Sequence, residues 1–176
     1  DKKSSVRSSL PSSAWAQEQL NKMSLEEKIA QFFMVAAYSN KGEDHLQEID
    51  RLVSEYKVGG IIFFQGEREN LLSSISRFQA KAKVPLLIGM DAEWGVSMRL
   101  FGEDHFPYAY TFGAANDVSL SEKMGAMMAQ ECRELGIHMN FSPVADVNSN
   151  PENPVIGFRS FGENPKIVAD QVSAFV

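Results

Sequence analysis

The 176-residue sequence predicts an α/β fold in which buried parallel strands alternate with amphipathic helices. Two short runs, at residues 61–64 and 85–90, are apolar throughout, which is typical of strands buried on both faces. The segments between such runs carry apolar residues at helical spacing, as in residues 44–56, where Leu46, Ile49 and Val53 fall on one face. Turn glycines separate the two patterns. Together these observations indicate strand–helix units of a parallel sheet.

Each predicted element follows from a local pattern. Ser24 and Glu27 have the spacing of a capping box, so a short helix is expected from there to Ala30. Met124, Met127, Met128 and Met139 are interpreted as core filling. Strands are predicted at residues 32–37, 61–64, 85–90 and 138–144, and residues 92–118 are expected to be a loop. Besides the short helix that ends at Ala30, helices are predicted at residues 15–23, 44–56, 67–82 and 165–176. One more helix is expected to be capped by Ser119 or Ser121 and to end at Gly136.

Two architectures fit four strand–helix units, an open doubly wound sheet and a (β/α)8 TIM barrel. A dinucleotide-binding sheet places a glycine-rich turn after its first strand, and residues 36–42 contain no such turn. A complete barrel needs about 250 residues, so the chain matches the first half of one. We therefore expect a flexible N-terminal tail at residues 1–13 and, at 14–176, the N-terminal half of a barrel domain that is truncated at its C-terminus.

The composition and charge of the chain argue against several classes of protein and of binding partner. The formal net charge is −6, which argues against a nucleic-acid partner because that requires a basic surface. No apolar run is long enough to span a bilayer. The single cysteine, Cys132, excludes a disulfide framework and is expected to be a buried apolar residue. The chain starts at Asp1 rather than at Met, so we expect an export signal to have been removed and a periplasmic or outer-surface location, with a cytoplasmic location left open.

In parallel α/β proteins the functional residues follow the carboxyl ends of the strands. Carboxylates and arginines bond sugar hydroxyls, and an aromatic face packs on the C–H surface of a sugar ring, so such a set predicts a sugar site. The candidates after the third and fourth predicted strands are Asp91, Glu93, Trp94 and Arg99, then Asp146, Asn148 and Arg159.

Each candidate also has a structural interpretation. Asp91 could cap a loop, Asp146 could brace the long loop that follows it, and Arg159 could pair with Asp146 or Glu163. The three histidines lack metal-ligand spacing. His45 is expected to be solvated at a helix start and His138 to open a strand, and an acid/base pair of Asp104 with His105 is disfavoured because adjacent residues seldom face each other.

Seven short segments spread over residues 14–176 form a recognisable series of motifs. They are residues 23–31 (MSLEEKIAQ), 89–99 (GMDAEWGVSMR), 106–107 (FP), 112–117 (FGAAND), 131–136 (ECRELG), 140–146 (NFSPVAD) and 153–162 (NPVIGFRSFG). In type and order these segments resemble the motifs of glycoside hydrolase family 3, and most closely those of its bacterial β-N-acetylhexosaminidases.

This resemblance implies a retaining exo-glycosidase that hydrolyses terminal β-linked N-acetylhexosamine, with cell-wall fragments as plausible substrates. It implies that Asp91, Arg99 and Arg159 bind the sugar, that a carbohydrate is the partner, and that no metal or organic cofactor is needed. The alternatives are a β-glucosidase or xylosidase of the same family and a non-catalytic carbohydrate-binding relative.

The chain departs from the family in lacking a K-H-x-P-G-H-G-type loop and a later aspartate nucleophile. We therefore expect no catalytic residue in the chain itself, with the nucleophile Asp and the acid/base His beyond Val176. The isolated fragment is expected to be inactive. The missing second half of the barrel, or a partner chain, is expected to cover the exposed edges near residues 32–37 and 140–144.

Overall fold

The computed structural model describes residues 13–176, so the predicted tail lies outside the described residues except for Ser13. The sheet has four parallel strands in the order β1-β2-β3-β4. These are β1 (Met34–Ala37), β2 (Gly60–Phe63), β3 (Leu87–Met90) and β4 (Met139–Asn140). In the register, Val35 lies opposite Ile61, and Ile61 opposite Ile88. The parallel α/β fold is confirmed, and the open sheet is part of a barrel.

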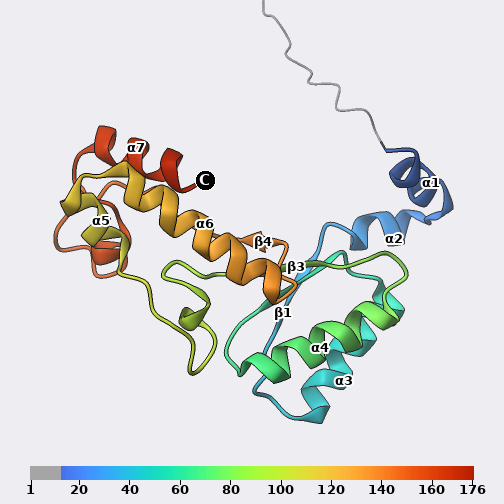
Figure 1. Cartoon of the computed structure of the whole chain (residues 1–176). Coiled ribbons are helices and arrows are strands. Elements are labelled where there is room, and N and C mark those ends of the chain that lie inside the picture. Colours follow the sequence, from blue (N-terminus) through green and yellow to red (C-terminus); the bar gives the residue numbers. More distant parts are fainter. Residues whose placement is uncertain (1–12) are drawn as a thin grey trace, which may run out of the picture.

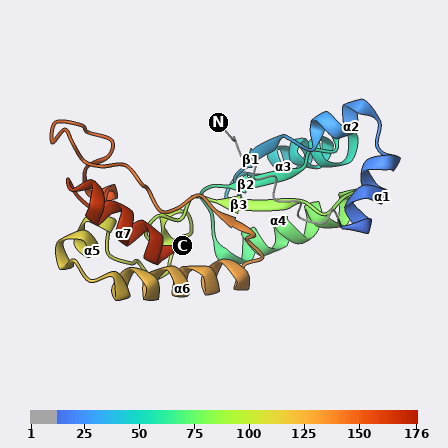
Figure 2. The same cartoon turned by 90° about the horizontal axis from the view of Figure 1, so that it is seen from above.

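Helices are arranged in two groups around the sheet. Figure 1 shows α3 and α4 side by side against the strands, whereas α5, α6 and α7 form a second group, and Figure 2 shows the two groups at opposite ends of an elongated molecule. The helices are α1 (Ala14–Lys22), α2 (Leu25–Ala30), α3 (Glu43–Arg51), α4 (Arg68–Lys81), α5 (Ala109–Ala115), α6 (Val118–Glu134) and α7 (Pro165–Phe175).

The core lies between the central strands and α4. Ile61, Phe63 and Ile88 have no exposed surface. The rings of Phe63 and Phe78 of α4 stack with their centroids 6.3 Å apart. Burial of residues on both faces of β2 and β3 explains why their sequences show no polar alternation.

The N-terminal half follows the sequence prediction closely. Ser24 and Glu27 form the expected capping box at the start of α2. The helix expected at 44–56 is α3 continued by a π-helical turn (Leu52–Tyr56), which ends where Lys57 adopts a φ of 60°. Strand β1 begins two residues later than expected, because the N–H groups of Phe32 and Phe33 bond back to carbonyls of α2.

Three predictions in the C-terminal half were wrong. The strand expected at 138–144 is reduced to β4, because its partner β3 ends at Met90, whose carbonyl oxygen accepts the last bond of this ladder, from the N–H of Phe141. The expected loop 92–118 contains α5, which is stabilised by tertiary packing: a Cβ on Gly113 would overlap the backbone of Phe161. The N-cap of α6 is Asp117 rather than a serine, and its side chain accepts from the N–H of Ser119.

The methionine prediction holds in part. Met124 and Met128 are buried, whereas Met127 and Met139 are 56% and 39% exposed. Other large apolar side chains beside the outer strands are exposed as well. Phe32 and Phe33 before β1 are 92% and 58% exposed. The free edges of the sheet are thus apolar, as expected for part of a barrel.

None of the helices in residues 13–176 has the length and apolar character required to cross a membrane.

Candidate functional site

The loop that follows β3 holds the first charged pair. Arg99 Nη2 donates to Asp91 Oδ2 at 2.7 Å, and Arg99 Nε donates to the Asp91 carbonyl oxygen at 3.2 Å. The guanidinium also lies over the ring of Phe64, 4.7 Å from its centroid, just after the end of β2. Arg99 is therefore fixed on two sides and orients the carboxylate of Asp91.

A second pair joins the loops after β3 and β4. Arg159 donates from Nε and Nη2 to the two carboxylate oxygens of Glu93 at 2.8 and 2.7 Å. Its Nη1 donates to the Val155 carbonyl oxygen at 3.2 Å. The expected alternative partners, Asp146 and Glu163, do not bond it. The reason is geometric: Glu93 meets the planar guanidinium with both oxygens, the arrangement that best matches its fork of donors.

The two pairs lie close enough to influence each other. The hydrogen bonds with Glu93 raise the pKa of the Arg159 guanidinium, and the negative charges of Asp146 and Asp91 act in the same direction. Glu93 lies two residues after Asp91, so the Glu93–Arg159 pair brings Arg159 beside the loop that carries Asp91, although 67 residues lie between Asp91 and Arg159 in the sequence. Arg99 joins the group through Asp91.

Both pairs retain hydrogen-bonding capacity. Arg159 has five N–H donors, and the described residues engage three of them. Asp91 Oδ1 accepts no hydrogen bond within residues 13–176, while its side chain is 28% exposed. A polyhydroxylated ligand could thus donate to Asp91 and accept from Arg159, with both groups already oriented.

Other polar groups hold the two loops in place. The side chain of Asn140, in β4, accepts from the N–H of Ala92 and donates to its carbonyl oxygen, at 3.0 and 3.2 Å. Ala92 lies between Asp91 and Glu93, so this bracket positions both carboxylates. Ser160, which is fully buried, donates to the Asp146 carbonyl oxygen at 2.6 Å. The predicted bracing at Asp146 therefore uses its backbone, and the carboxylate stays exposed.

The sequence prediction missed the roles of Asn140 and Phe64, and it included Glu93 among the candidates without identifying Arg159 as its partner. Asn140 and Glu93 stand within the recognised motif segments, but their types and spacing do not reveal their partners. The position of Phe64 at the end of a buried strand could have suggested a role, since functional residues follow such ends.

The histidines and the cysteine have structural roles. His45 is partly buried rather than solvated: its Nε2 accepts from the N–H of Tyr38 at 3.1 Å, and burial lowers its pKa. His138 stands at the start of β4 as expected, and its Nδ1 accepts from the N–H of Ile88. Cys132 is buried, which raises the pKa of its thiol. Asp104 and His105 form no hydrogen bond within the described part of the chain.

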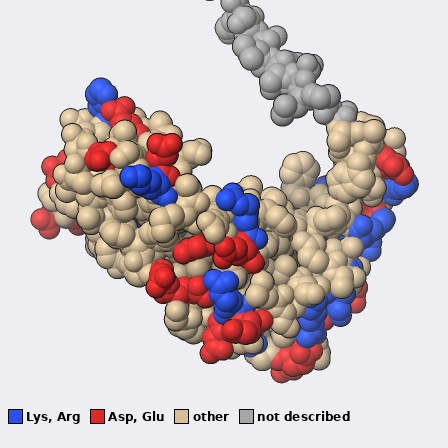
Figure 3. Space-filling model, in the orientation of Figure 1, with Lys and Arg blue, Asp and Glu red and all other residues tan. Residues whose placement is uncertain are grey.

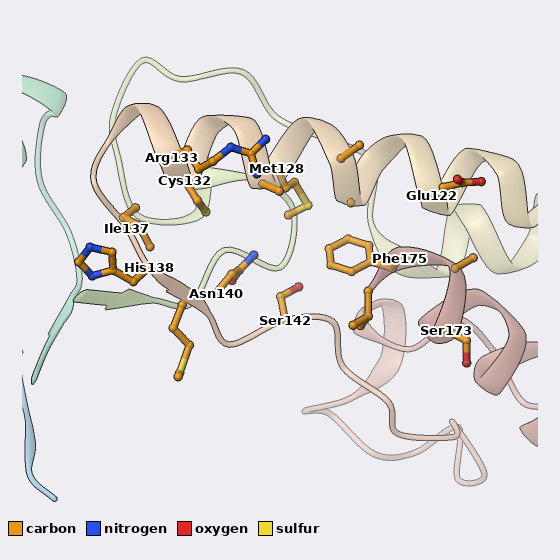
Figure 4. A pocket seen from close by; sticks show the side chains of 16 residues that line it. Glu122, Met128, Cys132, Arg133, Ile137, His138, Asn140, Ser142, Ser173 and Phe175 are labelled. Atoms are coloured by element: carbon orange, nitrogen blue, oxygen red, sulfur yellow. The ribbon is translucent and has the colours of Figure 1, made fainter. Parts of the chain in front are cut away.

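A cavity of about 830 Å³ lies elsewhere, between α6, residues 137–142 and the end of α7. Figure 4 shows Met128, Cys132, Ser142 and Phe175 around it. It runs along the edge of β4 that pairs with no other strand among residues 13–176. Its lining contains none of Asp91, Arg99 and Arg159, so it is separate from the charged pairs.

Charge is unevenly distributed over the surface. Figure 3 shows an arch whose hollow is bordered mostly by uncharged residues, while acidic and basic side chains gather on the opposite side. Residues 13–176 contain no group of three or more His, Cys, Asp or Glu that could hold a metal ion.

A parallel sheet of alternating strands and helices, with paired carboxylates and arginines at its strand ends, defines part of an α/β barrel, the class of fold in which functional residues follow the carboxyl ends of the strands. The model of the glycosyl hydrolase family 3 N terminal domain matches residues 24–176. The chain belongs to this family.

Two proteins and one solved structure illustrate the similarity. Beta-hexosaminidase A of Pseudoalteromonas piscicida is 36% identical over 73% of this chain and 24% of its own length, and beta-hexosaminidase of Vibrio cholerae is 33% identical over 81% and 42%. The structure of a family 3 beta-N-acetylglucosaminidase from Paenibacillus sp. str. FPU-7 aligns with a TM-score of 0.74 at 34% identity, covering 88% of this chain and 30% of that one. The chain therefore spans less than half the length of these relatives.

Proposed function

We propose that this chain is the sugar-binding part of a retaining exo-glycosidase that removes terminal β-linked N-acetylhexosamine, in particular N-acetylglucosamine. The observation that carries the proposal is the convergence of the Asp91–Arg99 and Glu93–Arg159 pairs, with unengaged donors and acceptors, at the carboxyl ends of two strands. The names of the relatives support the choice of sugar.

Each residue then has a distinct role toward the sugar. Asp91 accepts hydrogen bonds from sugar hydroxyls, because a carboxylate can accept from two donors at once. Arg159 donates to the sugar with the N–H groups that Glu93 and Val155 leave unengaged. Arg99 orients Asp91 and neutralises its charge when water leaves the site.

The residues that bind the sugar are distinct from the catalytic groups that break the glycosidic bond. Retaining hydrolysis needs a nucleophile and an acid/base group on either side of the glycosidic bond. Asp91 and Glu93 each face a guanidinium, an arrangement suited to binding. We propose that the two catalytic groups lie outside this chain and that the chain by itself is inactive. We also propose that further barrel strands cover the exposed apolar edges near Phe32 and Phe141.

The proposal is tested by kinetics of the full-length protein that carries this chain. Nitrophenyl β-glycosides of N-acetylglucosamine, glucose and xylose are compared, and the highest kcat/KM is expected for N-acetylglucosamine. The first product is expected to be the β-anomer. Higher kcat/KM for glucose or xylose would identify the alternative glycosidase, and sugar binding without turnover of any substrate would identify a non-catalytic relative.

A further inference from the structure

The short segment that carries Arg99 is attached to the fold by contacts that the proposed sugar binding does not use. We refer to residues 96–103, from Val96 to Glu103, as the Arg99 segment. Leu100, the residue after Arg99, is 1% exposed and packs in the main core. Because the Arg99 side chain extends from the middle of this segment, the attachments of the segment decide where the guanidinium lies.

The loop after β2 holds the middle of the Arg99 segment through its backbone. The N–H of Gly66 donates to the Arg99 carbonyl oxygen at 3.1 Å, and the N–H of Phe101 donates to the Gly66 carbonyl oxygen at 3.0 Å. A Cβ on Gly66 would overlap the side chain of Ser39, which is 6% exposed, so Gly66 is itself closely packed. Phe64, whose ring lies against the Arg99 guanidinium, stands two residues before Gly66. The same short loop therefore contacts both the backbone and the guanidinium of Arg99.

An ion pair holds the end of the Arg99 segment. Arg68 donates from Nε and Nη2 to the two carboxylate oxygens of Glu103, both at 2.8 Å. Arg68 is the first residue of α4 and follows Gly66 by two positions, so the pair joins the segment to the same loop a second time. The side chain of Glu103 is 17% exposed. A two-oxygen contact with a planar guanidinium fixes orientation as well as distance.

The start of the Arg99 segment contacts α6. Glu131 Oε2 accepts from the N–H of Val96 at 3.4 Å, and the Val96 carbonyl oxygen accepts from the N–H of Arg99 at 2.9 Å. The segment is thus held at its start, in its middle and at its end. Loss of the ion pair at its end is therefore expected to displace Arg99 without releasing the whole segment.

We propose that the Arg68–Glu103 pair positions Arg99, which in turn orients Asp91 toward the sugar. Neither Arg68 nor Glu103 bonds Asp91 or the Arg99 side chain within residues 13–176, so the pair is expected to act through the backbone of the Arg99 segment. The Arg99 guanidinium has to lie against Phe64 and donate to Asp91 at the same time, and a small shift of the backbone breaks one of these contacts. The inference rests on the proposed function, because it takes Asp91 as an acceptor for the sugar.

The test is a double-mutant cycle on kcat/KM for a β-N-acetylglucosaminide in the full-length protein. Arg68→Ala removes the ion pair and is expected to lower kcat/KM about tenfold, since a misplacement of about 1 Å can cost about 100-fold. Arg99→Lys retains the charge but has no planar guanidinium to orient, so in that background Arg68→Ala is expected to cost less than about twofold. Glu103→Ala removes the same two bonds from the other side and is expected to reproduce both results.

Arg51→Ala is the matched control. Arg51 and Glu48 form a pair of the same kind within α3, where no sugar contact is proposed, and its loss is expected to leave kcat/KM unchanged. An equal loss from Arg68→Ala in both backgrounds, with a lowered melting temperature, would show that the pair only supports the fold and would overturn the proposal. An unchanged kcat/KM in Arg68→Ala or in Arg99→Lys would overturn it as well. If the unmodified protein hydrolyses no β-N-acetylglucosaminide, the proposed function itself is wrong and this inference is overturned with it.

Discussion

Among the regions that pair arginine with carboxylates, the contact between α3 and α4 and the strand ends differ in which hydrogen-bonding groups the pairs leave unengaged. On the outer helices, Arg77 of α4 donates to both Glu43 and Asp50 of α3, and Lys81 donates to Asp50 as well. At the strand ends, Arg99 and Arg159 each pair with a single carboxylate.

The difference separates bracing from binding. Between α3 and α4, one carboxylate oxygen of Asp50 accepts three hydrogen bonds. The other oxygen is buried and has no hydrogen-bond partner within residues 13–176. At the strand ends, Asp91 Oδ1 and part of the Arg159 guanidinium remain accessible. An ion pair alone therefore does not indicate a site, whereas its position at a strand end and its unengaged groups do.

The largest expected effect is that of Asp91→Ala on catalysis. Loss of the carboxylate removes the proposed sugar acceptor and leaves Arg99 without its partner. We expect kcat/KM for a β-N-acetylglucosaminide to fall by about 100-fold or more in the full-length protein, as two or more charged hydrogen bonds are lost. A fall of less than about threefold, with the protein folded by circular dichroism, would remove Asp91 from the site.

Asp50→Asn is expected to affect stability without affecting activity. Asn keeps the shape of the side chain but weakens the bonds from Arg77 and Lys81 to a side chain that is 11% exposed. We expect a loss of about 1–2 kcal/mol in the free energy of unfolding and an unchanged kcat/KM. A loss of activity at unchanged melting temperature would break the distinction between the two regions.

Asn140→Leu tests whether the site depends on the bracket around Ala92. Leu preserves the volume but leaves two buried backbone groups unpaired, at a cost of about 1–3 kcal/mol. We expect kcat/KM to fall several-fold, since Asp91 and Glu93 flank Ala92. Asn140→Asp retains the acceptor for the Ala92 N–H and is the milder control; an equal loss in both variants would contradict the bracket.

The smallest expected effect is the pH dependence of the stability that Asp50 contributes between α3 and α4. Burial favours the neutral form of Asp50, but hydrogen bonds from Arg77 and Lys81 outweigh it and lower the pKa of the carboxyl. A lowered folded pKa adds stability above the unfolded pKa of about 3.9, and this is lost as the pH falls through the folded value. The stability difference between the unmodified protein and Asp50→Asn should therefore shrink below about pH 4. A difference that stays constant from pH 6 to pH 3 would contradict this.

Sequence patterns predicted the N-terminal half of the fold better than the C-terminal half. The buried strands around Ile61 and Ile88 are visible because burial on both faces leaves a continuous apolar run. Helix α5 was missed because its stability comes from packing of Gly113 on Phe161, a contact distant in the sequence. The short length of β4 depends on where its partner β3 ends, which the apolar pattern of residues 138–144 alone does not show.

The candidate site shows the same division. The position of Asp91, Arg99 and Arg159 after apolar strands identified them as candidates from the sequence. Their partners could not be predicted, because the Glu93–Arg159 pair depends on how two long loops meet in space. Local rules describe each loop separately and give no information on contacts between loops.

Arg159→Lys gives the most direct test of the claim that these arginines bind sugar. Lysine keeps the positive charge beside Glu93 but cannot donate from a planar fork. In the full-length protein we predict that kcat/KM for a β-N-acetylglucosaminide falls about 10–150-fold, nearly as far as in Arg159→Ala, while the melting temperature falls by only a few degrees. An unchanged kcat/KM in Arg159→Lys and Arg159→Ala, with a large fall in melting temperature, would show that Arg159 only braces the loops.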